Sequence, residues 1–66
     1  MARTNKKTYT VDSKPGLNVR EQPDVNSKVL RVLSDRERVV VDIISEVPEG
    51  WKLLLDGGYV MTAYLK

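Results

Sequence analysis

Apolar and polar residues alternate along this chain in short runs, and segments rich in Gly, Pro, Asp, Asn and Ser separate the runs. A repeat of two residues is typical of a β-strand with one buried face, whereas an amphipathic helix repeats at about 3.6 residues. No stretch follows the helical repeat over a useful length. The pattern therefore predicts an all-β protein without a long helix.

The chain has 66 residues and no cysteine, which restricts it to one small domain without disulfide bridges. Short strands in so small a domain shield a core best in a strongly bent sheet or closed barrel, which also covers exposed edges. We therefore expect a small barrel of about five or six strands. The predicted strands cover residues 8–11, 17–20, 29–33, 38–44, 51–55 and 59–61, with a short 3-10 turn at 62–65.

The faces of the two strongest strands are predicted from alternation. The side chains expected to point inward from residues 38–44 are Val39, Val41 and Ile43, and those expected to share one face of residues 51–55 are Trp51, Leu53 and Leu55. This leaves Val40, Ile44 and Leu54 on the outward face, although all three are apolar. We expect these three residues to make a second apolar contact, with the N-terminal segment or with another copy of the chain as a weak homodimer.

Charge is unevenly distributed along the chain. The chain contains eleven Lys and Arg and nine Asp and Glu, but Arg3, Lys6 and Lys7 all lie near the N-terminus. We expect residues 1–7 to form a flexible basic arm and residues 8–66 to form the single folded domain. Because nucleic-acid binders gather positive charge on a folded face, nucleic acid is the least favoured class of partner.

The composition argues against catalysis. The chain contains no histidine and no cysteine, which removes the usual general base at neutral pH, the thiol nucleophile and the commonest zinc ligands. Carboxylates such as Glu46 and Glu49 would need a sugar cleft between them to act as a glycosidase pair. A barrel of this size offers no deep cleft, so we expect no enzymatic activity and no cofactor.

No apolar segment approaches the roughly 20 residues that a membrane-spanning helix needs, and the N-terminus lacks the apolar part of a secretory signal. We therefore expect no membrane association. The compartment stays open: the chain is expected to be cytoplasmic or phage-encoded if it is free-standing, and extracellular or wall-associated if it is a module of a longer secreted protein.

Several short motifs occur in a fixed order. Residues 17–20 read Leu-Asn-Val-Arg and precede Pro23, and three later motifs follow at 50–51 (Gly-Trp), 58–60 (Gly-Tyr-Val) and 64–65 (Tyr-Leu). Together, over residues 8–65, they resemble the bacterial Src homology 3 domain, a small β-barrel that binds and does not catalyse. Gln22 and Arg36 depart from the family pattern, because glycine is usual at both positions. At Arg36 we expect an altered turn or a strained residue.

The resemblance implies a groove between the loops 20–28 and 45–50, with Trp51 and Tyr64 as its floor. Indole and phenol groups offer flat apolar area for a sugar ring, a proline or an aliphatic stem and keep one polar group free. Acidic residues in the two loops are expected to attract an amine or a guanidinium. These residues are Glu21, Asp24, Glu46 and Glu49.

The expected ligand is an extended peptide with a positive group. The resemblance suggests the peptide stem or cross-bridge of bacterial peptidoglycan, or a proline-bearing protein segment. The alternative is a free-standing, phage-encoded adaptor or inhibitor that caps a protein partner with Val40, Ile44 and Leu54. A purely structural interpretation also stays open, in which Trp51 belongs to the core and the acidic residues only keep the loops soluble. Arg20 is expected to brace a loop carbonyl or carboxylate.

Overall fold

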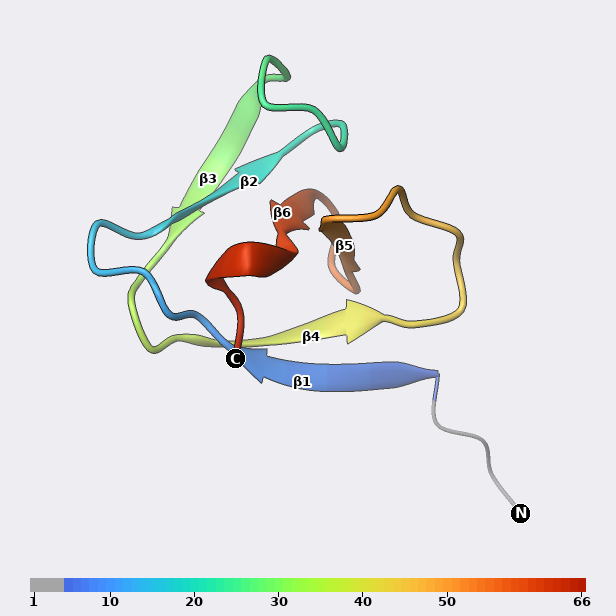
Figure 1. Cartoon of the computed structure of the whole chain (residues 1–66), viewed down its shortest axis with the longest axis horizontal. Coiled ribbons are helices and arrows are strands. Elements are labelled where there is room, and N and C mark those ends of the chain that lie inside the picture. The colour runs from blue at the N-terminus through green and yellow to red at the C-terminus, as the bar shows by residue number, and fades with distance from the viewer. Residues whose placement is uncertain (1–4) are drawn as a thin grey trace.

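The computed structural model describes residues 5–66, which form one bent antiparallel sheet of six strands (Figure 1). The elements are β1 (Lys6–Thr10), β2 (Leu17–Arg20), β3 (Val29–Leu33), β4 (Arg38–Asp42), β5 (Trp51–Leu54), β6 (Tyr59–Met61) and the 3-10 turn η1 (Thr62–Tyr64). Their order across the sheet is β1-β4-β5-β6-β2-β3. The all-β prediction and the short 3-10 turn near the C-terminus are confirmed.

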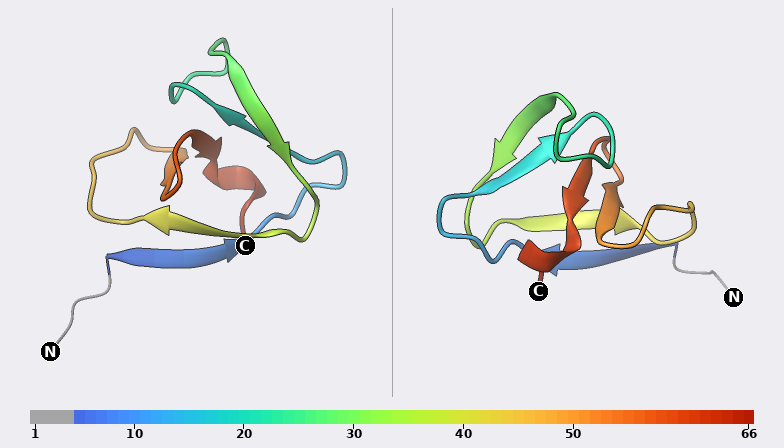
Figure 2. Two further views of the ribbon diagram at one scale, coloured as in Figure 1. Left: turned by 180° about the vertical axis from the view of Figure 1, so that it is seen from behind. Right: turned by 45° about the horizontal axis from the view of Figure 1, so that its top comes forward.

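The sheet curls so that β2 and β3 stand apart from β1 and β4, with β5 and β6 between them (Figure 2). Backbone contacts join the end of β1 to the C-terminal residues. Val11 forms an isolated bridge with Leu65, and Thr10 and Lys66 each donate an N–H to the other's carbonyl at 2.9 and 2.8 Å. The first and last segments thereby close one corner of the curved sheet.

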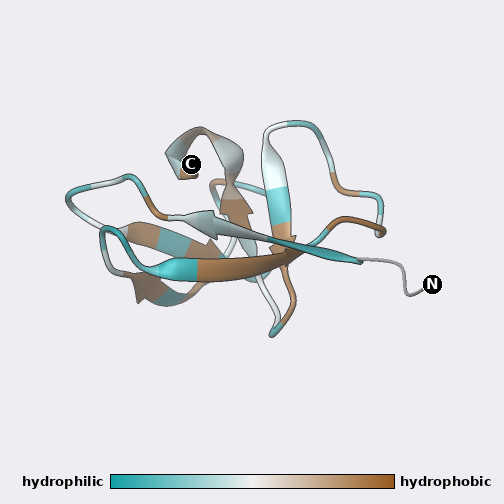
Figure 3. Cartoon of the chain, turned by 90° about the horizontal axis from the view of Figure 1, so that it is seen from below, coloured by the Kyte–Doolittle hydropathy of each residue, from teal (hydrophilic) through white to brown (hydrophobic). Residues whose placement is uncertain are grey.

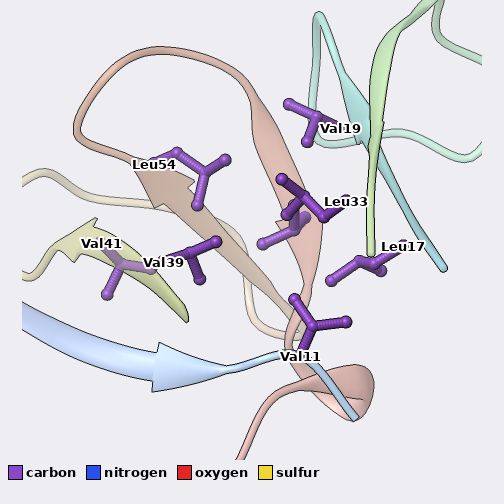
Figure 4. Packing of buried hydrophobic residues seen from close by; sticks show 8 residues of the cluster. Val11, Leu17, Val19, Leu33, Val39, Val41 and Leu54 are labelled. Carbon is purple, nitrogen blue, oxygen red and sulfur yellow. The ribbon is translucent and has the colours of Figure 1, made fainter. Parts of the chain in front are cut away.

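A cluster of eight buried aliphatic side chains fills the inside of the curve (Figure 4). The cluster consists of Val11, Leu17, Val19, Leu33, Val39, Val41, Leu54 and Val60. Within residues 5–66 no polar or charged side chain is buried. Burial of an aliphatic side chain of this size contributes about 1.5–3 kcal/mol, so this cluster is the main source of stability.

The alternation within β4 is only partly as predicted. Val39 and Val41 are buried, at 8% and 0% exposure, but the prediction for Ile43 is wrong because its side chain is 49% exposed. β4 ends at Asp42, and the Asp42 carboxylate accepts the N–H groups of Ile44 and Ser45. Ile43 still donates its N–H to the Asn5 carbonyl at 3.2 Å, but the pairing with β5 ends at Asp42, and the local turn leads the chain away from β5.

The faces of β5 are reversed relative to the prediction. Leu54 is 2% exposed and Leu55 is 53% exposed, because Leu54 pairs with the buried Val41 and therefore points to the same side of the sheet. The predicted outward surface of Val40, Ile44 and Leu54 consequently does not form as a set. Figure 3 shows hydrophobic and hydrophilic residues following one another along the ribbon of the strands.

The N-terminal segment pairs earlier than predicted. β1 begins at Lys6, with Lys6 opposite Asp42 and Lys7 opposite Val41. The Lys7 ammonium lies 5.1 Å from the ring centroid of Tyr9, within range of a cation–π contact. The predicted flexible arm over residues 1–7 is therefore wrong for Lys6 and Lys7, while residues 1–4 lie outside the described residues.

Arg36 has a φ of 70° and holds the strained position that its departure from the family pattern predicted. It is the third residue of a turn in which Glu37 donates its N–H to the carbonyl of Ser34 at 3.1 Å. A non-glycine residue in this region costs about 1–2 kcal/mol. We expect Arg36→Gly to raise the free energy of unfolding by up to about 1 kcal/mol in urea titrations, because glycine's added chain entropy offsets part of the relief.

Arg36→Ala is the matched control, because alanine removes the guanidinium and keeps the strained backbone. We expect its free energy of unfolding to stay within about 0.5 kcal/mol of the native value. Equal stabilisation by glycine and by alanine would mean that the side chain, and not the backbone, is the source of the strain.

Candidate functional site

The outer face of β5 and β6 carries a cluster of partly exposed apolar side chains. Trp51 pairs with Met61, and Leu53 pairs with Tyr59. Residues paired across antiparallel strands point to the same side of the sheet. Because the fully buried Val60 points into the core between Tyr59 and Met61, all four paired side chains face outward. The pairing of β5 with β6 therefore keeps the indole of Trp51 out of the core.

A cavity of about 260 Å³ continues this surface toward β2 and η1. Its walls include Met61 and Tyr64 together with Pro15, Asn18 and Arg20. Tyr64 is 43% exposed. Met61 thus belongs both to the Trp51 pair and to the cavity at Tyr64.

We call the three residues Trp51, Met61 and Tyr64 the aromatic strip. The cavity at Tyr64 is not lined by Trp51, so the two predicted aromatic residues are linked by Met61 and do not floor one common cavity. Met61 was missed in the sequence, where its only signal was its place in the last strand. Its flexible, polarisable side chain suits a surface that adapts to a ligand.

The two polar loops lie on different sides of β5 and β6, with residues 21–28 at the top and residues 43–50 at the right of Figure 1. Residues 43–50 lead directly into Trp51, and Thr62 donates its N–H to the Gly50 carbonyl at 2.8 Å. Residues 21–28 follow Arg20, whose backbone pairs with Tyr59. Each loop therefore starts or ends at the outer face that carries the aromatic strip.

Arg20 braces the loop of residues 21–28. Its Nη1 donates to the carbonyl of Ser27 at 2.9 Å across the loop, and Gln22 donates its backbone N–H to the Ser27 hydroxyl at 2.8 Å. The bracing role predicted for Arg20 is confirmed. A braced loop loses less conformational entropy when a ligand binds against it.

The four predicted acidic residues, Glu21, Asp24, Glu46 and Glu49, are all exposed. Asp24 already serves its own loop, because its carboxylate accepts the N–H of Asn26 at 2.9 Å. Glu46 borders a shallow hollow formed within residues 46–48. Neither of the ion pairs found within residues 5–66 involves one of these acids. Their charge is therefore available to attract a cation near the outer face.

Asp42 fixes the start of the loop that leads to Trp51. Its carboxylate accepts the N–H of Ile44 at 2.7 Å, the N–H of Ser45 at 3.1 Å and the hydroxyl of Ser45 at 2.9 Å. The hydrogen bond from Ile44, followed by those from Ser45, lowers the pKa of Asp42 below its ordinary value. The folded state thus prefers the ionised carboxylate.

The hydrogen bonds of Asp42 therefore make the structure of the loop depend on pH. A carboxyl group with a lowered pKa stabilises the fold above its ordinary pKa of about 3.9, and the contribution is lost as the pH falls through the lower folded value. We expect the amide signals of Ile44 and Ser45 to shift in NMR spectra only at pH values below about 3.9. At neutral pH, Asp42→Asn should shift both signals, whereas Asp56→Asn should leave them in place. A midpoint at or above the ordinary carboxyl value would contradict this assignment.

Comparisons of the chain with protein-family models, with curated proteins and with solved structures found no match. No helix within residues 5–66 is both long and apolar enough to span a membrane. In the same part of the chain, no group of three or more His, Cys, Asp or Glu side chains is placed to hold a metal ion. The site is therefore defined by its own geometry: an aromatic strip between two polar loops.

Proposed function

We propose that this chain is a non-catalytic binding module whose aromatic strip takes an extended peptide carrying a positive group. The peptide stem or cross-bridge of bacterial peptidoglycan is the ligand class that the resemblance to the bacterial Src homology 3 domain suggests. The observation that carries the proposal is the pairing of Trp51 with Met61 on the outward side of β5 and β6.

The chemistry of the strip supports a peptide ligand. Trp and Tyr supply rigid apolar area with one hydrogen-bonding group each, and such residues dominate the binding energy of many interfaces. Glu49 lies two residues before Trp51 in the sequence, and Glu46 lies in the same loop. Exposed carboxylates in the loop next to Trp51 steer a cationic ligand and favour one orientation. The aromatic contacts provide most of the affinity.

Co-sedimentation with purified peptidoglycan sacculi tests the proposal. We expect Trp51→Ala and Tyr64→Ala each to weaken binding by about tenfold or more, which corresponds to about 1.4 kcal/mol. Val40→Ala is the control, because Val40 is an exposed aliphatic residue of β4 outside the strip. Urea unfolding of each variant shows whether the fold is retained.

Two results would contradict the proposal. If a folded Trp51→Ala variant binds sacculi as tightly as the native chain, the aromatic strip is not the binding site. If the native chain does not bind sacculi at all, the peptidoglycan assignment is wrong, and a proline-bearing peptide becomes the ligand to test. Acetylation of the free amines of the sacculi should weaken binding if the acidic loops contribute.

The other two functional classes have less support. The adaptor hypothesis relied on an outward surface of Val40, Ile44 and Leu54, and Leu54 is buried in the core. Nucleic-acid binding would need a concentrated basic face. The two loops beside the aromatic strip instead carry four exposed carboxylates. Binding that weakens steeply with salt would favour the nucleic-acid class.

A further inference from the structure

A second cavity, of about 360 Å³, lies between β3, the start of β4 and the turn that joins β5 to β6. Its floor includes three core residues, Leu33, Val39 and Leu54, and its lip includes the exposed side chains of Val40 and Leu55. None of the residues around it belongs to the aromatic strip. The cavity therefore extends down to core residues, and its lining residues differ from those of the cavity at Tyr64, although Leu33 of the one pairs with Leu17 of the other.

The strand beside this cavity has an unpaired edge. β3 is the last strand of the sheet and pairs only with β2 within residues 5–66. Three of its five residues are exposed aliphatics: Val29 at 40%, Leu30 at 47% and Val32 at 59%. Figure 2 (left) shows β3 and β4 diverging from the turn that connects them. An apolar edge strand of this kind can pair with an additional extended segment.

β4 pairs with β1 along its whole length, but its other edge is only partly covered next to the cavity. Its pairing with β5 covers Val41 and Asp42, and the Val40 carbonyl accepts the N–H of Leu55 at 3.0 Å. Arg38 lies beyond this last contact with β5. The opening between β3 and β4 thus presents backbone groups, an apolar floor and an apolar lip together.

The charges around the cavity favour an acidic ligand. Three cationic side chains and two carboxylates line it: Lys6, Arg31, Arg38, Glu37 and Asp56. Arg31 pairs with Asp56 at 3.0 Å, and Glu37 accepts the N–H of Ser34 at 2.9 Å. Lys6, Arg38 and Glu37 make no ion pair within the described part of the chain. Two positive charges and one negative charge therefore remain at the rim, a net charge of +1.

From these features we infer that β3 and this cavity bind an extended segment of a partner protein. The segment adds to the free edge of β3, one apolar side chain enters the cavity, and an acidic residue lies against Lys6 and Arg38. Alternate residues of a strand point to opposite sides. An apolar residue on one side of the segment can therefore reach the cavity while an acidic residue on the other side reaches the cationic rim. This surface is separate from the aromatic strip and does not depend on its function.

Two synthetic peptides test the inference. One is an acetylated and amidated pentapeptide of sequence Glu-Leu-Val-Leu-Glu, and the other replaces both glutamates with lysine. In two-dimensional NMR titrations of the labelled protein, we expect the acidic peptide to shift the amides of β3 and of Arg38 and to bind at least about tenfold more tightly than its lysine twin, a difference of about 1.4 kcal/mol.

Surface variants locate the binding site. Leu55→Asp places a carboxylate at the apolar lip, and Arg38→Glu reverses a rim charge, so each should weaken the acidic peptide by about tenfold or more. Ile44→Asp is the control, because Ile44 is 65% exposed and lies outside the cavity. It should leave the affinity unchanged.

Several results would overturn the inference. These are equal affinity for the two peptides, shifts confined to the aromatic strip, and no shifts with millimolar peptide. A dilution series without peptide addresses the other occupant of an exposed edge strand, a second copy of the chain. If the β3 amides shift with protein concentration alone, the edge pairs with itself and the partner segment is excluded.

Discussion

Replacing Leu54 with alanine is expected to lower the free energy of unfolding by about 2–5 kcal/mol. Leu54 is 2% exposed and pairs with the fully buried Val41, so its truncation leaves a cavity inside the curved sheet. A domain of 66 residues has a total stability of roughly 3–10 kcal/mol, at about 0.05–0.15 kcal/mol per residue. This single change therefore removes a large part of the stability, and urea unfolding measures it.

Leu55→Ala is the matched control, since it removes the same atoms from the neighbouring residue. Leu55 is 53% exposed, so we expect its loss to change the stability by no more than about 0.5 kcal/mol. The opposite order of the two effects would mean that β5 faces the other way, as the alternation of its sequence predicts. That result would also move Trp51 into the core.

Gly58→Ala is expected to lower the free energy of unfolding by about 2–5 kcal/mol, through backbone strain and overpacking together. Gly58 has a φ of 94°, and a Cβ atom there would overlap Cγ1 of Val19. Val19 is fully buried, so it has little room to move away. Thermal or urea unfolding measures the loss.

Gly57→Ala separates the two contributions. Gly57 has a φ of 106°, but nothing lies within 4 Å of the position its Cβ would take. Its substitution should therefore cost only the strain, about 1–2 kcal/mol. Equal losses at the two glycines would show that the close approach of Gly58 to Val19 is absent.

The strands with clear ends were predictable from the sequence. Turn-forming residues flank 17–20, 29–33 and 59–61, and the structure places β2, β3 and β6 at these positions. The local signal sufficed because glycine, proline and short polar residues act on the backbone within a few residues. The expectation of an altered turn or a strained residue at Arg36 came instead from the resemblance, in which glycine is usual at that position, and Arg36 has a φ of 70°.

The faces of β5 were not predictable, because both Leu54 and Leu55 are apolar and either could have pointed inward. The choice depends on the pairing of Leu54 with Val41, which is a contact between distant parts of the chain. The strand at Lys6 and Lys7 also depends on a contact between distant parts of the chain. Their charge indicated a solvated arm, but pairing with β4 holds them in a strand.

The candidate site was predictable in its aromatic residues and not in its layout. Trp51 and Tyr64 were singled out from the sequence, but the residue that links them is Met61, which lies opposite Trp51 only because of the register of β5 and β6. Asp24 shows the reverse case, because a residue expected to attract a ligand also forms a hydrogen bond within its own loop. Register and loop hydrogen bonds are three-dimensional facts that residue types alone do not specify.

We propose that the aromatic strip binds an extended peptide with a positive group. Two-dimensional NMR of the labelled chain, titrated with soluble muropeptides, tests it most directly. We predict saturable shifts of the indole N–H of Trp51 and of the amides of Met61 and Tyr64, with weaker binding once the free amine of the muropeptide is acetylated. If these signals stay in place with muropeptides and with a proline-rich peptide, the strip is not a peptide-binding surface.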